Sequence, residues 1–230
     1  LILISVIMPV MNNESSIVES IDSILKQTYE NFEFLILDDF SNDNTYKIIK
    51  EYEKKDDRIK IFKNNKNLGL TRSLNILISH SKGSLIARQD GDDMSFQHRF
   101  AEQLYYFQNL DYDFCVTRAE TLQESKVLPR FSYYVPASFV SNFKNPFIHG
   151  TLMIRKETLL DIGTYNESYY YSQDFKLFKD LLSKNTRFKY LKEPLYRLNM
   201  QNNISTLKKA EQKYYADSIK RNQHPTKFIK

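Results

Sequence analysis

Short apolar runs alternate with amphipathic helical patterns along the first half of the chain. The apolar runs that are typical of buried strands lie at 2–8, 32–37, 58–62 and 84–88. Apolar residues recur at helical spacing at 14–27, 42–54, 71–79 and 96–109. Strands that alternate with helices form a parallel sheet covered on both faces. The pattern therefore predicts an α/β fold with a Rossmann-like, mostly parallel sheet.

The second half of the chain is less regular and predicts a smaller lobe. Strand patterns occur at 114–118, 147–155 and 187–191, the middle one interrupted at His149 and Gly150. Helical patterns occur at 156–162 and 173–183, and a polar turn at 201–203 precedes a basic helix. We therefore divide the chain into a first half at 1–110, a second half of the same domain at 111–206, and a C-terminal helix or tail at 207–230.

Polar residues follow three of the predicted strands. The segments after the first, second and fourth strands are 9–14, 38–41 and 90–93. Ligands of parallel α/β sheets bind outside the carboxyl ends of the strands, and these ends share one edge. We therefore expect the three segments to converge on a ligand-binding site.

The segment R-Q-D-G-D-D gathers Asp90, Asp92 and Asp93 around Gly91. Carboxylates at this spacing repel each other, and a divalent cation such as Mg²⁺ or Mn²⁺ offsets that repulsion with hard oxygen ligands. Gly91 allows the backbone to turn sharply and to approach a ligand closely. The alternative is an acidic helix start, in which Asp92 or Asp93 caps the following helix. The segment by itself leaves both interpretations open.

Charge and cysteine content narrow the class of protein. The chain has 230 residues, a net charge of +5 and a single cysteine, Cys115. The charge excess lies in 207–230, which is typical either of a solvated helix face or of contact with an anionic membrane surface. The rest is balanced, so we expect no nucleic-acid partner. One cysteine in an apolar run suits a reducing compartment, and the opening apolar run is interpreted as a strand rather than a signal peptide.

Several motifs in order resemble the family 2 glycosyltransferases of the GT-A fold. The first half carries S-V-I-M-P-V-M-N-N-E, I-L-D-D-F-S-N-D-N-T, N-L-G-L-T-R-S-L-N and Q-D-G-D-D. The second half carries H-G-T-L-M-I-R-K-E, S-Q-D-F-K-L-F-K-D-L and E-P-L-Y-R. The resemblance covers about 4–205 and is strongest to bacterial enzymes that build capsule, O-antigen or other surface glycans. It implies a nucleotide-sugar-binding half at 1–110 and an acceptor-binding half at 111–206.

The resemblance assigns donor-binding roles in the first half. Residues matching the nucleotide-contacting positions are Pro9, Val10, Met11, Glu14, Asp39, Arg72, Asp90 and Asp92. Asp39 matches the carboxylate that binds uracil, whereas its neighbour Asp38 is expected to order the loop. For Arg72, a plain place on the helix surface is an equal alternative. The metal is expected on Asp92, with Asp93 close behind as a second ligand.

The catalytic base is expected in the second half. Family members carry a Glu-Asp pair at the start of a helix, and the Asp deprotonates the acceptor hydroxyl. Here the pair is Gln173-Asp174, so Asp174 is the predicted base and the role of Gln173 is in doubt. Placement at a helix N-terminus is expected to favour the ionised carboxylate. His149 and Gln173 are candidates for contact with the donor sugar or acceptor, although a histidine satisfied within its loop is an equal alternative.

The resemblance implies an inverting glycosyltransferase that uses Mn²⁺ or Mg²⁺. It would move a sugar from a nucleotide sugar, expected to be a UDP-sugar, to a hydroxyl of a glycan or lipid-linked acceptor. We expect a cytoplasmic protein, peripheral at the inner membrane if the basic tail contacts anionic lipid, and a mobile loop near 200–206 over the donor. The alternative is a non-catalytic nucleotide-sugar-binding protein of the same fold, which Gln173 keeps open.

Overall fold

A nine-stranded mixed sheet forms the centre of the described part of the chain. The computed structural model describes residues 1–201 and 208–226. The sheet order is β3-β2-β1-β4-β8-β6-β9-β5, with β7 paired to β6. The strands are β1 (Ile4–Val10), β2 (Phe32–Asp38), β3 (Ile59–Lys63), β4 (Leu85–Arg88), β5 (Met94–Ser95), β6 (Phe114–Thr121), β7 (Val127–Leu128), β8 (Met153–Arg155) and β9 (Phe188–Leu198).

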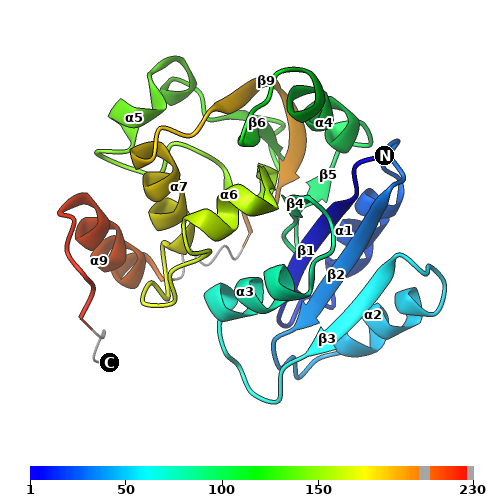
Figure 1. Ribbon diagram of the computed structural model, residues 1–230. Coiled ribbons are helices and arrows are strands. Elements are labelled where there is room, and N and C mark those ends of the chain that lie inside the picture. Colours follow the sequence, from blue (N-terminus) through cyan, green and yellow to red (C-terminus); the bar gives the residue numbers. More distant parts are fainter. Residues whose placement is uncertain (202–207, 227–230) are drawn as a thin grey trace.

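The first four strands are parallel, as the alternating pattern predicts. β1 pairs with β2 and β4, and β2 pairs with β3, in each case parallel. The arrows of β1, β2 and β3 point the same way in Figure 1. β8 runs antiparallel to both β4 and β6, while β9 is parallel to β6. The predicted mostly parallel α/β sheet is confirmed.

Helices cover both faces of the sheet. They are α1 (Ile17–Leu25), α2 (Thr45–Glu53), α3 (Leu70–His80), α4 (Arg99–Asn109), α5 (Ala137–Val140), α6 (Lys156–Asp161), α7 (Gln173–Ser183) and α9 (Lys209–Lys220). Side chains of β1 alternate between faces, so that Val6 packs in the core with α1, α2 and α4, and Ile7 packs in the core with α3, α6 and α7. This two-sided burial explains why β1, β2 and β4 are mostly apolar.

The predicted strand at 147–155 is shorter than expected, whereas its predicted interruption at His149 and Gly150 is confirmed. Residues His149–Thr151 form a 3₁₀ turn and only Met153–Arg155 is a strand. A Cβ on Gly150 would collide with the phenol ring of Tyr196. The backbone therefore passes close over a buried ring at the point where the strand pattern is interrupted. The strands β5 and β7 were not predicted either, because a strand of two residues is too short to show an alternating pattern.

The single sheet extends across the boundary predicted at residue 110. β5, from the first half, pairs with β9 from the second half. The division at 110 and 111 stays a prediction. The predicted turn at 201–203 and the loop at 200–206 lie largely outside the described residues.

The basic C-terminal helix docks on the second half. Tyr215 and Ile219 of α9 are buried against Phe175 of α7 and Tyr169. Figure 1 shows α9 beside α7. None of the helices in the described ranges is both long enough and apolar enough to cross a membrane.

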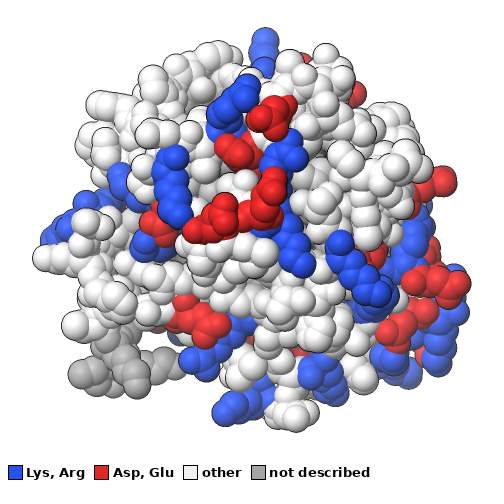
Figure 2. All heavy atoms as spheres, in the orientation of Figure 1, with Lys and Arg blue, Asp and Glu red and all other residues white. Residues whose placement is uncertain are grey.

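Charges on the surface seen in Figure 2 are interleaved, with acidic and basic side chains lying together in the middle of this face. Ion pairs in the chain are mostly local, such as Lys176 with Asp180 one helical turn on. Exposed pairs of this kind contribute little to stability, about 0–1 kcal/mol. The buried polar groups at the sheet edge are therefore the better candidates for a functional site.

Candidate functional site

The three predicted loops meet at one edge of the sheet. Val10 at the end of β1 is in register with Asp38 at the end of β2, and Ile7 is in register with Arg88 at the end of β4. The backbone N–H of Asp39 donates to the carbonyl of Val10 at 2.8 Å. The expected convergence is therefore confirmed, and it places the segments after β1, β2 and β4 side by side.

Hydroxyl groups of α1 hold the acidic loop in place. The Ser20 hydroxyl donates to the carbonyl of Asp90 at 2.8 Å, and the Ser16 hydroxyl donates to the carbonyl of Gly91 at 3.1 Å. A Cβ on Gly91 would lie 2.8 Å from Cγ1 of Val10, so only glycine fits this close approach of the two loops. The backbone of the loop is fixed by α1, which leaves its carboxylates to face the sheet edge.

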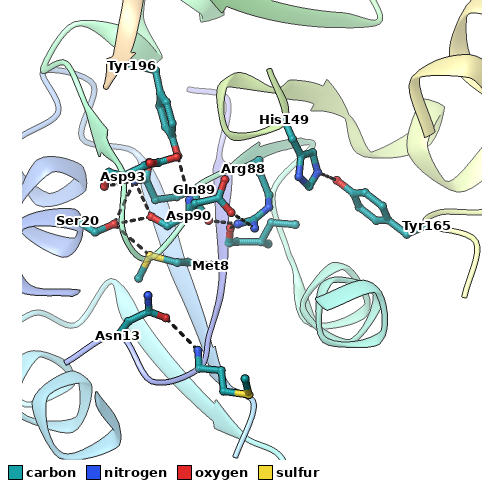
Figure 3. A network of polar contacts seen from close by, with 12 residues as sticks. Met8, Asn13, Ser20, Arg88, Gln89, Asp90, Asp93, His149, Tyr165 and Tyr196 are labelled. Atoms are coloured by element: carbon teal, nitrogen blue, oxygen red, sulfur yellow. Dashed lines mark hydrogen bonds and ion pairs between the residues drawn. The ribbon is translucent and has the colours of Figure 1, made fainter. Parts of the chain in front are cut away.

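Arg88 and Tyr196 orient Asp90 (Figure 3). The fully buried guanidinium of Arg88 pairs with the Asp90 carboxylate and also donates to the carbonyl of Ile7 at 3.3 Å. The backbone N–H of Asp90 donates to the Tyr196 hydroxyl at 3.0 Å. A buried charge requires compensation, and this pair supplies it. Asp90 is thus held from its backbone and from its side chain.

The other two carboxylates of the loop differ in environment. Burial first, and then the charge of Asp90, raises the pKa of Asp92 to about 6. Asp93 is 4% exposed, and its Oδ1 accepts a hydrogen bond from the backbone of Asn199 at 2.7 Å. Asp93 therefore ties β9 to the acidic loop, a structural contact that the sequence did not indicate. This contact makes Asp92 the stronger of the two predicted metal ligands.

The donor set fits a divalent cation that is held partly by substrate. No group of three or more His, Cys, Asp or Glu side chains is arranged around a common point within 1–201 and 208–226. Mg²⁺ is commonly bound through one or two carboxylates together with substrate phosphates. Asp92 and Asp90 match that requirement, since burial and, to a smaller extent, the charge of Asp90 raise the pKa of Asp92, and a cation would relieve the repulsion between the two carboxylates.

Asp39 orders the loop before α3. Its two carboxylate oxygens accept hydrogen bonds from the backbone N–H groups of Leu68 and Gly69, each at 2.8 Å. The side-chain amide of Asn64 donates to the same carboxylate at 2.8 Å. Asp38, which was predicted to order the loop after β2, accepts a 3.3 Å hydrogen bond from the backbone N–H of Ser41 in that loop. The contact of Asp39 with uracil stays a prediction.

Of the remaining residues that were predicted to contact the nucleotide, Glu14 and Arg72 have hydrogen-bonding or charged partners within the protein. Glu14 accepts two hydrogen bonds from Asn44, each 2.9 Å, at the start of α2. Pro9 and Val10 are the last buried residues of β1, and Met11 follows them at the surface. Arg72 is exposed on α3 and pairs with Glu167 at 3.2 Å.

A segment of the second half is docked on α3 beside the Asp39 loop. The Thr71 hydroxyl donates to the carbonyl of Tyr169 at 2.9 Å. Asn75 and Tyr165 exchange two hydrogen bonds, at 2.9 and 3.1 Å. The Tyr170 ring lies directly against Gly69, whose φ is 85°. The segment at 165–170, which leads into α7, is therefore fixed to the loop that Asp39 orders. We call it the α3-docked segment.

Asp174 lies in the first turn of α7, as predicted. The side-chain amide of Asn145 donates to its carboxylate at 2.7 Å. Burial raises the pKa of Asp174, although the backbone of Phe175 and the Asn145 bond oppose that rise. We expected the helix N-terminus to favour ionisation, but burial outweighs it. Gln173 is buried just ahead of it, with 8% exposure.

His149 has a partner within the protein. Its Nε2 and the Tyr165 hydroxyl form a 2.6 Å hydrogen bond, which Figure 3 places beyond Arg88 from the acidic loop. Burial, followed by the charge of Arg88, lowers the pKa of His149 well below its usual range. The histidine is therefore neutral at physiological pH, and its predicted contact with donor or acceptor stays a prediction.

Sequence reasoning missed the residues that orient the predicted ones. Arg88 and Tyr196 lie inside motifs that were recognised, but their roles depend on burial and on contacts between strands distant in sequence. Asn145 carried no signal beyond the proline that follows it. An arginine at the end of an apolar strand, two residues before an aspartate, is the one signal that could have indicated the buried ion pair.

Comparison with known proteins agrees with this geometry. Residues 5–182 match glycosyl transferase family 2. EpsE of Bacillus subtilis is 35% identical over 204 residues, which cover 85% of this chain and 72% of EpsE. The O-antigen biosynthesis glycosyltransferase WbnJ of Escherichia coli is 33% identical over 217 residues, covering 90% of this chain and 83% of WbnJ.

Solved structures share the fold at low sequence identity. Residues 1–349 of S. aureus TarS in complex with UDP superpose with a TM-score of 0.76 and 21% identity, over 94% of this chain and 64% of that one. The Pyrobaculum calidifontis mannosyltransferase PcManGT in complex with GDP-Man and Mn²⁺ superposes with a TM-score of 0.77 and 17% identity, over 96% of this chain and 65% of that one. The fold is thus GT-A, and the chain belongs to glycosyl transferase family 2.

Proposed function

We propose that this glycosyltransferase moves a sugar from a UDP-sugar to an acceptor hydroxyl in one inverting, metal-dependent displacement. The observation that carries the proposal is that Asp90 and Asp92 lie in the loop after β4, held there by Arg88 and Ser20, at the sheet edge where β1 and β2 also end. Burial is the main cause of the raised pKa of Asp174, and the charge of Asp90 adds a smaller contribution, which supports placing Asp174 within electrostatic range of that edge. The complex of TarS with UDP supports a uridine donor, and the complex of PcManGT with GDP-Man and Mn²⁺ supports a nucleotide sugar with a divalent cation.

Each residue of the edge has one task in the proposed reaction. Asp92, with Asp90 beside it, would hold a Mn²⁺ or Mg²⁺ ion, which stabilises the charge of the leaving diphosphate. Arg88 keeps Asp90 in place. Asp174 accepts the proton of the acceptor hydroxyl as that oxygen attacks. Its raised pKa strengthens it as a base, and the bond from Asn145 keeps it oriented and stabilises its ionised form.

The acceptor is proposed to be a glycan or lipid-linked saccharide of bacterial surface polysaccharide synthesis. WbnJ acts in O-antigen biosynthesis according to its name. WfgD of Escherichia coli, 29% identical over 183 residues, is named as a glucosyltransferase acting on α-D-GlcNAc-diphosphoundecaprenol. A lipid-linked acceptor would bring the protein to the cytoplasmic face of a membrane. Exposed basic residues of α9, such as Lys209, would contribute to that contact.

The test of the proposed function is release of UDP from UDP-sugars in the presence of Mn²⁺ or Mg²⁺. Asp174→Asn should lower turnover by about 10²–10⁴-fold, because the amide cannot accept the proton. Binding of UDP with Mn²⁺, measured by calorimetry, should be retained. Asp180→Asn is the matched control, since Asp180 is on the same helix and pairs with Lys176.

Two outcomes would contradict the proposal. If Asp174→Asn turned over at the parent rate, the assignment of the base would be wrong. If the parent bound UDP with Mn²⁺ and released none from any UDP-sugar with acceptor present, the non-catalytic alternative would replace the enzyme, and Gln173 in place of the family's Glu would account for it.

A further inference from the structure

A pocket of about 270 Å³ opens beside Asp174. One side consists of the start of α7, with Ser172, Asp174 and Phe175, and of Asn145. The other side is the face of α9 that carries Gln212. Because Asp174 is the proposed base, whatever occupies this pocket lies next to the group that accepts the proton.

The α9 wall of the pocket is attached to the start of α7. The Ser172 hydroxyl donates to the backbone carbonyl of Gln212 at 3.1 Å and lies 2.8 Å from its side-chain oxygen. Behind these bonds, Tyr215 and Ile219 are buried against Phe175. The contact between α9 and α7 that forms this wall of the pocket is therefore part of the folded structure.

The charges around the pocket are predominantly positive. Asp174 is the single carboxylate among its lining residues, against the ammonium groups of Lys144, Lys213 and Lys220. Lys220 is paired with Asp217 at 2.9 Å. Lys144 and Lys213 are exposed and take part in none of the ion pairs found within the described residues. Lys220 first, and Lys213 to a smaller extent, lower the pKa of Asp217, so three ammonium groups at the pocket are set against the carboxylates of Asp174 and Asp217.

We infer that this pocket is the acceptor subsite and that it selects an acceptor saccharide bearing an anionic group, a phosphate ester or a carboxylate, near the reacting hydroxyl. The inference rests on the proposed function, because it takes Asp174 as the base. Asn145, Ser172 and Gln212 supply hydrogen-bonding groups for sugar hydroxyls, and Phe143 and Phe175 supply apolar surface. Lys144 and Lys213 attract the anion. Lys213 belongs to the basic segment 207–230, whose net charge alone would suggest contact with a membrane surface. In this inference it contacts the acceptor instead.

The inference can be tested by binding without turnover. The probes are glucose 1-phosphate, glucuronic acid and methyl glucoside, measured by ligand-observed NMR with the donor site saturated by UDP and Mg²⁺. Both anionic probes should bind about fivefold or more tightly than methyl glucoside at low salt, and the difference should shrink as NaCl is added. The double variant Lys144→Gln/Lys213→Gln should abolish the preference.

A matched control uses two lysines far from the pocket. Lys26→Gln/Lys54→Gln removes the same charge from α1 and α2 and should leave the preference intact. A preference for glucose 1-phosphate alone, or for glucuronic acid alone, would identify which anion the acceptor carries. Equal binding of neutral and anionic probes, or a preference that survives Lys144→Gln/Lys213→Gln, would overturn the inference.

The outcomes separate this inference from the proposed function. Unchanged turnover in Asp174→Asn would refute both the assignment of Asp174 as the base and the assignment of the pocket as the acceptor subsite. Loss of turnover in Asp174→Asn, combined with no anion preference, would leave the enzyme in place and refute the charge selectivity of the pocket.

Discussion

The side-chain amide of Asn145 donates a 2.7 Å hydrogen bond to the carboxylate of Asp174. The two residues come from different segments, a loop of the second half and the first turn of α7. The bond opposes the effect of burial, which raises the pKa of Asp174. Burial and the backbone N–H of Phe175 have the larger effects on this pKa, and Asn145 is the side chain that helps to keep it from rising further.

Replacing Asn145 with Ala should shift the acidic limb of activity to higher pH. Loss of a hydrogen bond to a charged group costs the ionised form about 1.5 kcal/mol, so the pKa of Asp174 should rise further. Because the base must be deprotonated, kcat should fall near neutral pH and recover at higher pH. The measurement is kcat against pH. Asn142→Ala on the same loop, which contacts Lys179 instead, should leave the limb unchanged. A uniform fall of kcat at every pH would contradict this role.

Replacing Asp92 with Asn should stabilise the metal-free protein at pH 7. The pKa of Asp92 is raised to about 6 by burial and by Asp90, whereas the unfolded chain titrates at about 3.9. The folded state binds the proton more tightly, so the contribution of this group to stability falls as pH rises from about 4 to about 6. The neutral amide removes that cost, which we expect to raise the midpoint of thermal unfolding by about 2–4 °C.

The same variant tests the metal assignment. Mn²⁺ with UDP should raise the unfolding temperature of the parent and have little effect on Asp92→Asn, because a ligand stabilises only a form that binds it. Affinity of the parent for Mn²⁺ should fall as pH decreases through about 6, as Asp92 takes up its proton. Equal stabilisation of parent and variant would show that Asp92 does not bind the metal.

Gly69→Ala should destabilise the protein more than Gly163→Ala. Both glycines have φ of 85°, but a Cβ at Gly69 would lie 2.6 Å from Cε2 of Tyr170, whereas none of the described atoms lies within 4 Å of a Cβ at Gly163. The shared backbone strain costs about 1 kcal/mol, and the clash adds about 1–3 kcal/mol at Gly69. Urea unfolding measures the difference. Adding Tyr170→Ala to Gly69→Ala should remove most of it, and equal costs at the two glycines would refute the steric argument.

Arg99→Ala should be among the most destabilising single changes. Arg99 is fully buried, and burial lowers its pKa to about 10, which keeps it charged at neutral pH. It donates to Gln103, to Ser95 and to the carbonyl of Arg88. Its loss leaves these acceptors unpaired around a cavity, at about 3–5 kcal/mol. Arg58→Ala, which breaks a partly exposed pair with Asp56, should cost about 1 kcal/mol. Denaturant midpoints compare the two, and similar costs would contradict the network.

The fold of the first half was predictable because its signals are local. Apolar strands such as 32–37 and helical spacing such as 71–79 depend on nearest neighbours, and the parallel order follows from their alternation. The interruption at His149 and Gly150 was predicted from the sequence, but the close approach of the Tyr196 ring to Gly150 was not, because Tyr196 belongs to a distant strand. Local pattern describes elements, whereas close packing between elements sets the irregular backbone.

The candidate site was predictable by residue type more than by role. Asp90, Asp92 and Asp174 were identified from motif and strand position. The contact of Asp93 with the backbone of Asn199 was not, because it joins residues 106 positions apart in the sequence. Asp39 likewise proved to hold a loop through both oxygens, which no spacing rule indicates.

The α3-docked segment has a consequence for the order in which the protein is made. Its bonds join residues such as Thr71 and Tyr169, 98 positions apart. Chains emerge from the ribosome N-terminus first, so the acidic loop at 90–93 is synthesised long before the helix that bears Asp174. A nascent or prematurely terminated chain would contain the acidic loop at 90–93 but lack the proposed proton acceptor, Asp174. Chemical competence would arrive only after the helix that bears the proposed base, Asp174, has been synthesised.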